Sequence, residues 1–595
     1  MRRLRLTGSI LRARARPVLA IIAGLALALA FPLPGWSGLA WIAPGLLLGA
    51  VAGAAPGRAF RLGYLAGLVH FLISLRWLLN IPFPIGATAG WLALSAYLAL
   101  FPAAWACLGS QLMRRFLAQP ANPDAGDGIV ESLRRFARCS WRQRTVWALV
   151  SAAAWVAWEM VQGRFLSGFP WNFLGASQFR VTPLIQIASI TGVYGVSFVV
   201  VWTSAALLGA AARLATRPCP GQSQEPLAGT RFPRNVLRGP FRRAGPVSFT
   251  GAFRWAPLAD LGLPLTVVVI LTFSGAARSL QPMPAGRELR VALVQPSIPQ
   301  ELIFNPGETT NRFDALLELS QLAAATRPDL ILWPEASMPT LTLSRHQALT
   351  NFIATHQAWM ILGSDDYEEI TAPCGGAAYD AYNAAFLFQP DGRHAGTYRK
   401  RRLVIFGEYI PFGEWLTFMN HLSPIEGSFR TGPGPVPFRL GGLAVNTSVL
   451  ICFEDVFPHG VREYVAPDTD FLINLTNNGW FGESSAHWQH AASAVFRAVE
   501  NGLPLVRCTN NGLTCWIDAW GRMRDWGTGD PTNIYRAGFA TYRIPLLPKG
   551  SVRAPTFYRE YGDLFGWGCT ALTGWTLLLL LRRRHPTLPS AIVTP

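Results

Sequence analysis

The chain has 595 residues, of which 50% are hydrophobic and only 14% charged. This composition excludes a single ordinary soluble domain and is typical of a membrane protein. The formal net charge of +18 would suit a nucleic-acid-binding protein, but the arginines fall between apolar segments rather than along one helix face, so we expect no nucleic-acid partner.

Apolar runs of about 18 residues or more, the length needed to cross a bilayer, predict eight membrane spans. Seven precede the central part of the chain and one follows it. The first run follows a basic segment, but further runs come directly after it, so we interpret it as an uncleaved span and not as a signal peptide. The predicted spans centre on Pro17–Phe31, Trp36–Ala54, Leu62–Leu79, Ala89–Leu112, Val146–Val161, Ile185–Leu208, Leu261–Phe273 and Leu564–Leu581.

The basic residues orient this array, because loops rich in Lys and Arg stay on the cytoplasmic side. Six arginines precede the first span, and the loops 113–145 and 209–256 carry seven and eight. The alternate loops 32–35 and 80–88 carry none. Both termini are therefore predicted to lie in the cytoplasm, and the central part of the chain on the opposite face of the membrane.

From Arg287 onward, short apolar strands alternate with helical segments, which is typical of a layered α/β domain. We therefore predict a membrane domain over 1–280, an extracytoplasmic catalytic domain over 281–560, and a C-terminal transmembrane helix with a cytoplasmic tail over 561–595. The predicted strands are 288–295, 330–333, 359–363, 384–389, 396–400, 443–452 and 470–474, and the predicted helices are 309–325, 346–356 and 487–500.

Glu335, Lys400 and Cys452 each lie at or near the end of a strand-like run. Taken singly, such residues are more often a turn, a solvated cation and a packing thiol. Together they form a covalent acyl-transfer site, because a nearby ammonium favours the thiolate and a carboxylate takes its proton. We predict Cys452 as nucleophile, Glu335 as general base, and Lys400 with the backbone N–H of Phe453 as oxyanion donors. Glu408 is predicted to hold Lys400 in place.

The remaining cysteines show no metal-binding spacing, and we predict neither a metal site nor a cofactor. The pairing state of Cys508 and Cys515 has two possible interpretations. They pair as a disulfide if this part of the chain is extracytoplasmic, or they are free, buried thiols, which is the interpretation that we favour.

Further motifs accompany the three candidate catalytic residues. They are Gly168–Gln178, Val294–Gln300, Phe406-Gly-Glu408, Cys452-Phe-Glu454, Asn477–Gly482 and Thr509–Gly512. With them, residues 287–550 resemble the nitrilase superfamily, whose Glu-Lys-Cys triad lies on an αββα sandwich. With seven predicted spans before this region and one after it, the chain resembles the apolipoprotein N-acyltransferase family of bacterial inner membranes, which implies a periplasmic catalytic domain.

The resemblance implies a ping-pong reaction between lipids. A phospholipid, by expectation phosphatidylethanolamine, donates its sn-1 acyl chain to Cys452 as a thioester, and the N-terminal amine of an S-diacylglyceryl-cysteine lipoprotein then accepts it. The resemblance also implies a supporting role for Glu454 and a lipid-gating role for Trp480, with Trp171 and Asn478 as further lipid-binding candidates. No coiled-coil heptads argue for assembly, so we expect a monomer.

This chain departs from the family pattern at two places. Phe453 stands where a tyrosine is usual, which removes a hydroxyl beside the nucleophile. Ile303-Phe304 stands where Lys-Trp is frequent, so Phe304 keeps an aromatic contact but the lysine is absent.

Two other functions remain open from the sequence. A membrane-tethered amidase would release the acyl group to water, and a lipid-binding or transport protein would carry a catalytically inactive domain. Glu159, near the end of a predicted span, is also open to two interpretations. An ionisable residue at such a depth is either functional or paired, and Arg164 is the candidate partner.

Overall fold

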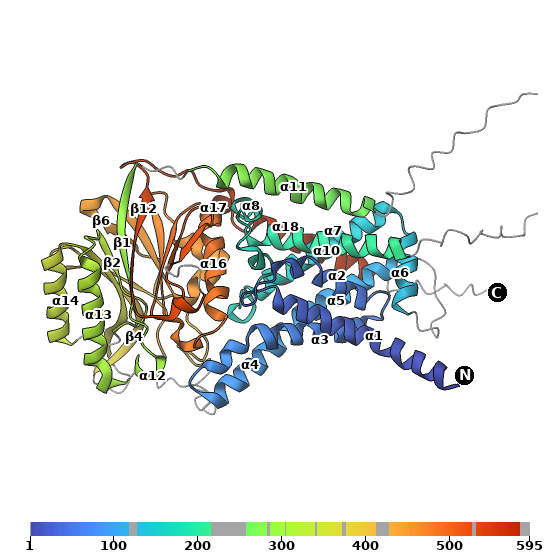
Figure 1. The fold of residues 1–595 in the computed structure, drawn as a ribbon, viewed down its shortest axis with the longest axis horizontal. Helices are drawn as coiled ribbons and strands as arrows, with labels where there is room; N and C mark the ends of the chain where they lie inside the picture. The colour runs from blue at the N-terminus through green and yellow to red at the C-terminus, as the bar shows by residue number, and fades with distance from the viewer. Residues whose placement is uncertain are drawn as a thin grey trace, which may run out of the picture.

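The computed structural model describes residues 2–117, 128–215, 258–282, 286–303, 305–338, 342–371, 377–411, 428–525 and 531–582; Phe304 lies outside them. Helices from the first 280 residues and the C-terminal helix gather at one end of the molecule, and two β-sheets with their covering helices lie at the other (Figure 1). The molecule thus combines a helical region with an α/β sandwich.

The helical region is built from long helices with short ones between them. They are α1 (Arg2–Leu29), α2 (Ala43–Ala50), α3 (Pro56–Ser74), α4 (Pro84–Leu98), α5 (Leu100–Phe116), α6 (Ile129–Arg138), α7 (Trp141–Gln162), α8 (Thr182–Ile185), α9 (Ala188–Thr191), α10 (Val193–Ala215), α11 (Ala259–Ser279) and α18 (Leu564–Arg582). Within the described ranges, four helical stretches are long and apolar enough to cross a membrane: 84–116, α10, α11 and α18. They overlap four of the predicted spans.

The second predicted span, Trp36–Ala54, does not form one long helix. A 3₁₀ turn over Ser37–Trp41 precedes α2, which has only eight residues. Pro44 lies in the first turn of α2 and supplies no N–H, so the helix begins there and does not continue the 3₁₀ turn. At about 12 Å, α2 alone is shorter than a hydrocarbon core of about 30 Å, and a crossing here needs the preceding turn as well.

Glycines allow the first helices to pack closely, as is common between helices in membranes. A Cβ added to Gly63 of α3 would lie 2.7 Å from the Cα of Ala103 in α5, and one added to Gly24 of α1 would lie 2.3 Å from the carbonyl oxygen of Ala66 in α3. Both distances are too short for any side chain. The helices α1, α3 and α5 therefore meet backbone to backbone.

Two six-stranded sheets form the sandwich. The parallel strands β1, β2 and β3 form the centre of the first sheet, and the parallel strands β7, β8 and β9 that of the second. The first sheet has the order β12 (Gly538–Leu546), β1 (Arg287–Gln295), β2 (Leu330–Leu332), β3 (Trp359–Thr371), β4 (Ala377–Phe388), β5 (His394–Arg399), and the second has the order β11 (Met523–Asp525), β10 (Cys515–Ile517), β9 (Leu505–Thr509), β8 (Phe471–Thr476), β7 (Val445–Ile451), β6 (Pro437–Leu440).

Helices cover the outer faces of both sheets. Val294 of β1 belongs to a core with Phe313 of α13 (Thr309–Ala324), whereas its neighbour Leu293 belongs to the core that holds Val449 of β7. Adjacent residues of a strand point to opposite faces, so β1 is covered by helices on one side and by the second sheet on the other. The helices α14 (Leu343–His356) and α16 (Ala486–Asn501) complete the layers, and α12 (Gln300–Ile303), α15 (Pro458–Val461) and α17 (Phe557–Tyr561) are short connections.

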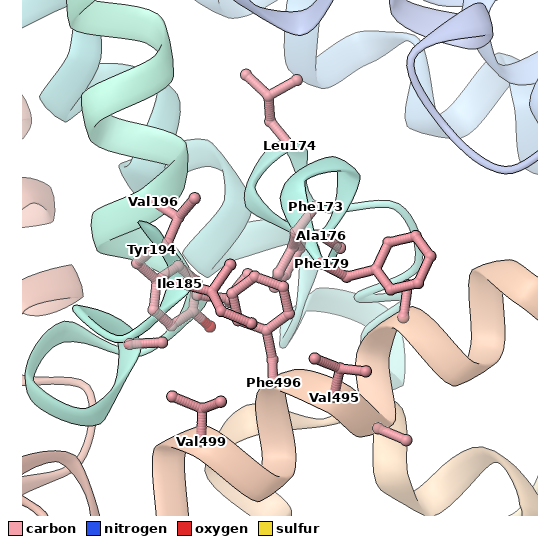
Figure 2. Close-up of a cluster of buried hydrophobic side chains, with 14 of the residues drawn as sticks. Phe173, Leu174, Ala176, Phe179, Ile185, Tyr194, Val196, Val495, Phe496 and Val499 are labelled. Carbon is pink, nitrogen blue, oxygen red and sulfur yellow. The ribbon is translucent and has the colours of Figure 1, made fainter. Parts of the chain in front are cut away.

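The helix α16 joins the sandwich to the helical region. Figure 2 shows Val495, Phe496 and Val499 projecting from α16 toward Phe173 and Tyr194 of the helical region, and all five side chains are buried. Burial of aromatic and branched side chains on both sides of this contact stabilises the association. The sandwich is therefore fixed against the helices and not suspended on a linker.

Cys508 and Cys515 are both buried and are not joined in a disulfide. The Cys508 thiol lies 3.4 Å from the carbonyl oxygens of Val294 and Leu332 in the first sheet. The structure therefore agrees with the interpretation of buried thiols and not with the disulfide.

Candidate active site

The three predicted catalytic residues come together where strands of both sheets end. Glu335 follows β2, Lys400 follows β5, and Cys452 follows β7. Their exposed fractions are 6%, 1% and 9%. Two residues come from the first sheet and one from the second, so the site forms only when the two sheets pack against each other.

Lys400 lies between two carboxylates. Its Nζ donates to Oε1 of Glu335 at 3.0 Å and to Oε1 of Glu408 at 2.8 Å, so Glu408 makes the contact predicted for it. Burial opposes the charge of Lys400, but the two carboxylates outweigh burial and raise the pKa of its ammonium well above the usual range. The two carboxylates therefore favour the charged form of Lys400.

Two asparagines hold the carboxylates in place: Asn383, which the sequence analysis did not identify, and Asn477, which begins one of the motifs named there. The Nδ2 group of Asn383 in β4 donates to both Glu335 and Glu408, each at 2.8 Å. The backbone N–H of Asn477 donates to Oε2 of Glu335, also at 2.8 Å. Three donors thus hold Glu335, and Oε2 carries only one of them. This oxygen is the better placed of the two to accept a proton.

Cys452 lies at a strained turn. Its φ of +51° is in the left-handed region, which is unfavourable for a non-glycine residue by about 1–3 kcal/mol. The Nδ2 group of Asn474 donates to the carbonyl oxygen of Cys452 at 3.1 Å and helps to hold this conformation. The strain turns the thiol out of the strand direction and toward the Glu335 and Lys400 side chains, whose charges both act on it.

The resting thiol is protonated. Burial and the Glu335 carboxylate raise the pKa of Cys452 to about 12, although Lys400 lowers it. Lys400 thus favours the thiolate, as expected, but burial and Glu335 outweigh it. A reaction at this thiol would require transfer of its proton, and Glu335 is a carboxylate whose charge acts on it.

Glu454 connects the strand that precedes Cys452 to the strand that precedes Lys400. Its carboxylate accepts from the backbone N–H of Ile451, directly before Cys452, and from the N–H of Arg401, directly after Lys400, each at 2.8 Å. The hydroxyls of Tyr398 and Tyr464 donate to it as well, at 2.7 and 3.0 Å. Burial raises the pKa of Glu454. Glu454 thus sets the spacing between nucleophile and cation without touching the reacting atoms itself.

An aromatic rim surrounds Phe453, the residue directly after Cys452. The ring of Phe453 lies 6.2 Å from Trp171 in a stacked arrangement, 5.8 Å from Phe169, and 5.1 Å from Phe457 in an edge contact. Trp171 is 2% exposed. Phe169 and Trp171 belong to the helical region. This region therefore contacts Phe453, the residue directly after Cys452.

Gln489 of α16 secures this rim, and nothing in the sequence distinguishes it beyond being a polar residue on a helix rich in alanine. Its Oε1 accepts from the indole N–H groups of Trp171 and Trp77 at 2.8 and 3.1 Å, and from Asn172 at 3.3 Å. Its Nε2 donates to the carbonyl oxygen of Pro32 at 2.9 Å. One side chain of the sandwich therefore binds several separate segments of the helical region.

Comparison with known proteins identifies the family. A model described as the apolipoprotein N-acyltransferase N-terminal domain matches residues 23–206, and one described as carbon-nitrogen hydrolase matches residues 290–528. An apolipoprotein N-acyltransferase from Geobacter metallireducens is 32% identical over 584 residues, which cover 95% of each chain. The chain belongs to the apolipoprotein N-acyltransferase family.

A second relative agrees with this assignment. A family member from Caulobacter vibrioides is 29% identical and covers 92% of this chain and 91% of its own. Among solved structures, an amidase of the nitrilase superfamily from Nesterenkonia AN1 is 16% identical, with a TM-score of 0.32, and covers 44% of this chain and 92% of its own. Family membership confirms the predicted resemblance and the acyltransferase function, in a membrane protein with a nitrilase-like sandwich.

The remaining site candidates lie at different depths. Asn478 is fully buried and its Oδ1 lies 3.2 Å from Nδ1 of His490, so it is placed below the site surface. Trp480 lies in the 3₁₀ turn Asn478–Phe481 and is partly buried. Phe304 belongs to the residues that the structure does not describe.

Proposed function

We propose that this family member transfers a fatty-acyl chain from a phospholipid, by expectation the sn-1 chain of phosphatidylethanolamine, through a Cys452 thioester to the N-terminal amine of an S-diacylglyceryl-cysteine lipoprotein. One observation carries the proposal: a protonated, buried thiol lies beside a Lys400–Glu335 pair at one end and an aromatic rim from the helices at the other. The charged end suits acyl transfer, and the apolar end suits lipids.

In the first half-reaction, the Cys452 sulfur attacks the ester carbonyl of the phospholipid as its proton passes to Glu335. The S–C bond forms, and Lys400 together with the N–H of Phe453 stabilises the negative charge on the carbonyl oxygen. The ester C–O bond then breaks. Glu335 returns the proton to the departing glycerol oxygen, so that a lysophospholipid leaves.

In the second half-reaction, the α-amine of the lipoprotein attacks the thioester carbonyl and gives a proton to Glu335. The C–S bond breaks, the amide is released, and the proton returns to the sulfur. Because Lys400 stays charged through both halves, it can stabilise both tetrahedral intermediates in turn. The triad needs no further ionisable group to complete this cycle.

The predicted topology and assembly are part of the proposal. The arginine distribution supports a chain with eight crossings, both termini in the cytoplasm, and the sandwich in the periplasm of a bacterial inner membrane. The strong contact of α16 with the helices supports a site held at the membrane surface, where both lipid substrates lie. We propose that the monomer is the active form.

The decisive test is mass spectrometry of the full-length protein after incubation with phosphatidylethanolamine. We expect a fatty-acyl mass on the peptide that contains Cys452, released by neutral hydroxylamine as a thioester should be. Cys508→Ala is the matched control, since it removes another buried cysteine and should leave the adduct intact. An adduct that persists in Cys452→Ala would refute the mechanism, and so would its absence from the wild type.

A second measurement separates acyl transfer from hydrolysis and from simple lipid binding. The acylated protein is supplied with a diacylated lipopeptide, and the acyl group is followed by chromatography. Transfer predicts an N-acylated peptide, whereas a membrane-tethered amidase predicts free fatty acid. A non-catalytic lipid-binding protein predicts neither product.

A further inference from the structure

Arg402, two residues after Lys400, holds its guanidinium at the boundary between the sandwich and the helical region. Its Nη1 donates to the carbonyl oxygen of Ser167 at 3.4 Å, and its Nη2 lies 3.3 Å from Nε2 of His459. The guanidinium also lies over the ring of Phe457, 4.8 Å from the ring centroid. The residue is partly exposed. Its side chain is thus held in place by groups that carry no negative charge.

No carboxylate forms an ion pair with Arg402 among the residues that the structure describes. The acidic groups nearby have other partners. Glu463 binds the adjacent Arg401 at 2.7 Å, and Glu454 accepts from the backbone N–H of Arg402 at 3.1 Å. A guanidinium carries five N–H donors in a planar fork. Arg402 therefore presents a positive charge without a counterion, and donors beyond those that its long contacts use.

His459 adds no compensating charge to this corner of the molecule. Burial, together with Arg164 and Arg402, lowers the pKa of His459 to about 4, so its imidazole is neutral at neutral pH. Arg164, which the sequence suggested as a partner of Glu159, binds Asp563 instead. The charge of Arg402 is therefore still available to a ligand.

The same corner lies at the end of a predicted span. Ser167 closes the short turn Phe165–Ser167, just after α7. Phe165 and Leu166 of this turn are 57% and 65% exposed. Large apolar side chains exposed beside a cation suit a membrane surface, where acyl chains and phosphates meet. The ligand expected at Arg402 is therefore an anion carried by a lipid.

The aromatic rim connects this guanidinium to the nucleophile. Phe457, which lies under Arg402, has an edge contact of 5.1 Å with Phe453, and Phe453 directly follows Cys452. In a phospholipid, one glycerol carries both the ester and the phosphate. A donor whose ester carbonyl lies at the Cys452 sulfur therefore brings its phosphate to the same end of the site as Arg402.

We propose that Arg402 binds the phosphate of the donor lipid and makes the site selective for phospholipids over neutral lipids. This inference rests on the function proposed above for the identity of the donor. Phosphate oxygens match the planar fork of a guanidinium and accept from it bidentately. The diacylglyceryl group of the acceptor carries no phosphate, so Arg402 acts on the donor alone.

The first test measures binding to the full-length Cys452→Ala protein, so that its outcome does not depend on thioester formation. Two lipids with the same acyl chains are titrated, and bound lipid is counted by native mass spectrometry: phosphatidylethanolamine and monogalactosyl diacylglycerol, which has a polar head group without phosphate. We expect phosphatidylethanolamine to bind about tenfold more tightly, because only its phosphate accepts charge-assisted hydrogen bonds from Arg402.

Two variants and a matched control locate this preference. Arg402→Gln should bring the ratio of the two affinities close to one. Arg402→Lys keeps the charge but not the fork, so it should give an intermediate ratio, and it carries the test if Arg402→Gln does not fold. Arg399→Gln is the control, because Arg399 also lies over an aromatic ring, that of Tyr382 at 3.9 Å, but is paired with Asp366 at 2.7 Å. It should leave the ratio unchanged.

A second measurement in the active protein separates phosphate binding from a general structural role. Arg402→Gln should raise KM for phosphatidylethanolamine about tenfold in the formation of the Cys452 adduct, and should leave KM for the diacylated lipopeptide unchanged. A rise of both KM values would mean that Arg402 only supports the rim. If the wild type formed no adduct, the proposed function would fail, whereas the binding ratio would still test Arg402.

Two further results would overturn the proposal. Equal affinity of the Cys452→Ala protein for both lipids, or a ratio that survives both Arg402 substitutions, would mean that this guanidinium does not recognise phosphate. Displacement of phosphatidylethanolamine by inorganic phosphate at the same concentration would mean that the corner is a site for the free anion and not for a lipid.

Discussion

The two sides of Cys452 are built on opposite principles. Below the thiol, one ammonium and two carboxylates are buried and fully bonded to one another. Beside it, at Phe453, aromatic rings meet at 5–6 Å, and neutral amides such as that of Gln489 supply polar contacts. Removing a partner from the first region leaves a buried charge, whereas removing a partner from the second leaves a buried dipole. The first loss is larger by several-fold.

This difference assigns the two regions different parts of the reaction. In the proposed reaction the charged centre handles the proton and the oxyanion, and hydrogen bonds hold its side chains in place. The aromatic rim contacts whatever lies between the sandwich and the helices, and such surfaces tolerate changes that conserve volume. Variants of the two regions should therefore differ in their effects. Changes in the charged centre should lower kcat and stability together, and changes in the aromatic rim should act mainly on KM for lipid.

Lys400→Met should have the largest effect, because it leaves Glu335 and Glu408 buried without their cation. We expect about 3–5 kcal/mol less stability and no measurable acyl transfer. Thermal unfolding in detergent and the lipopeptide assay measure the two quantities.

Arg439→Met is the control for the lysine variant. It removes an ion pair with Asp468 in the same domain, but Arg439 is 70% exposed, so stability should change by less than about 0.5 kcal/mol. If both variants lost the same stability, the contrast between buried and exposed charges would be wrong.

Alkylation of Cys452 should show the next largest effect, because its pKa is raised from the ordinary 9.0 to about 12 by burial and Glu335. At pH 7 the thiolate fraction should be about a thousandfold lower than in a cysteine peptide, since each pH unit is a factor of ten. The iodoacetamide rate should therefore keep rising with pH beyond 9, where the peptide levels off. A plateau at 9 in the folded protein would show that the thiol is not shifted.

The same shift predicts the sign of a stability change. Between pH 9 and 12 the unfolded chain loses the Cys452 proton while the folded protein keeps it, so the free energy of unfolding should fall as pH rises through this window. Cys452→Ala should remove this part of the decline. The difference between the two proteins isolates the thiol from the other groups that titrate there.

Glu454→Gln should have an intermediate effect. An amide NH₂ in place of one carboxylate oxygen faces a backbone N–H at Ile451 or at Arg401, and two donors repel. We expect about 1–3 kcal/mol less stability and a slower appearance of the Cys452 adduct with KM unchanged. An unchanged rate of adduct formation would mean that the spacing of the two strand ends does not depend on Glu454.

The residues of this site that directly follow apolar runs could be predicted from the sequence. Glu335, Lys400 and Cys452 each follow such a run, and parallel strands bring their ends to one edge. Asn383 could not be found in this way, because it lies within β4 and contacts the site only through pairing of β3 with β4. The end of β3, from Asp365 to Thr371, is polar and becomes a strand through the same pairing.

Contacts between distant segments also set the limits in the rest of the fold. The strand β12 contains Pro545 and pairs with β1 across about half of the chain, and no local pattern announces such a partner. In the helical region, hydropathy located the apolar run at Trp36–Ala54 but could not show the restart of the helix at Pro44. Hydrophobic pattern predicts where a segment is buried, whereas its exact shape depends on what it packs against.

Gln489→Met should have the smallest effect and the most selective one. Methionine fills a similar volume but leaves the indoles of Trp77 and Trp171 without an acceptor, which should cost about 1–3 kcal/mol. With the rim loosened, KM for phospholipid should rise several-fold while kcat stays within about twofold. Gln186→Met is the matched control, because Gln186 also joins the helices to the sandwich, through the carbonyl oxygen of Trp520 at 2.8 Å. It should lower stability without changing KM, and equal KM values for both variants would mean that Gln489 only holds the two regions together.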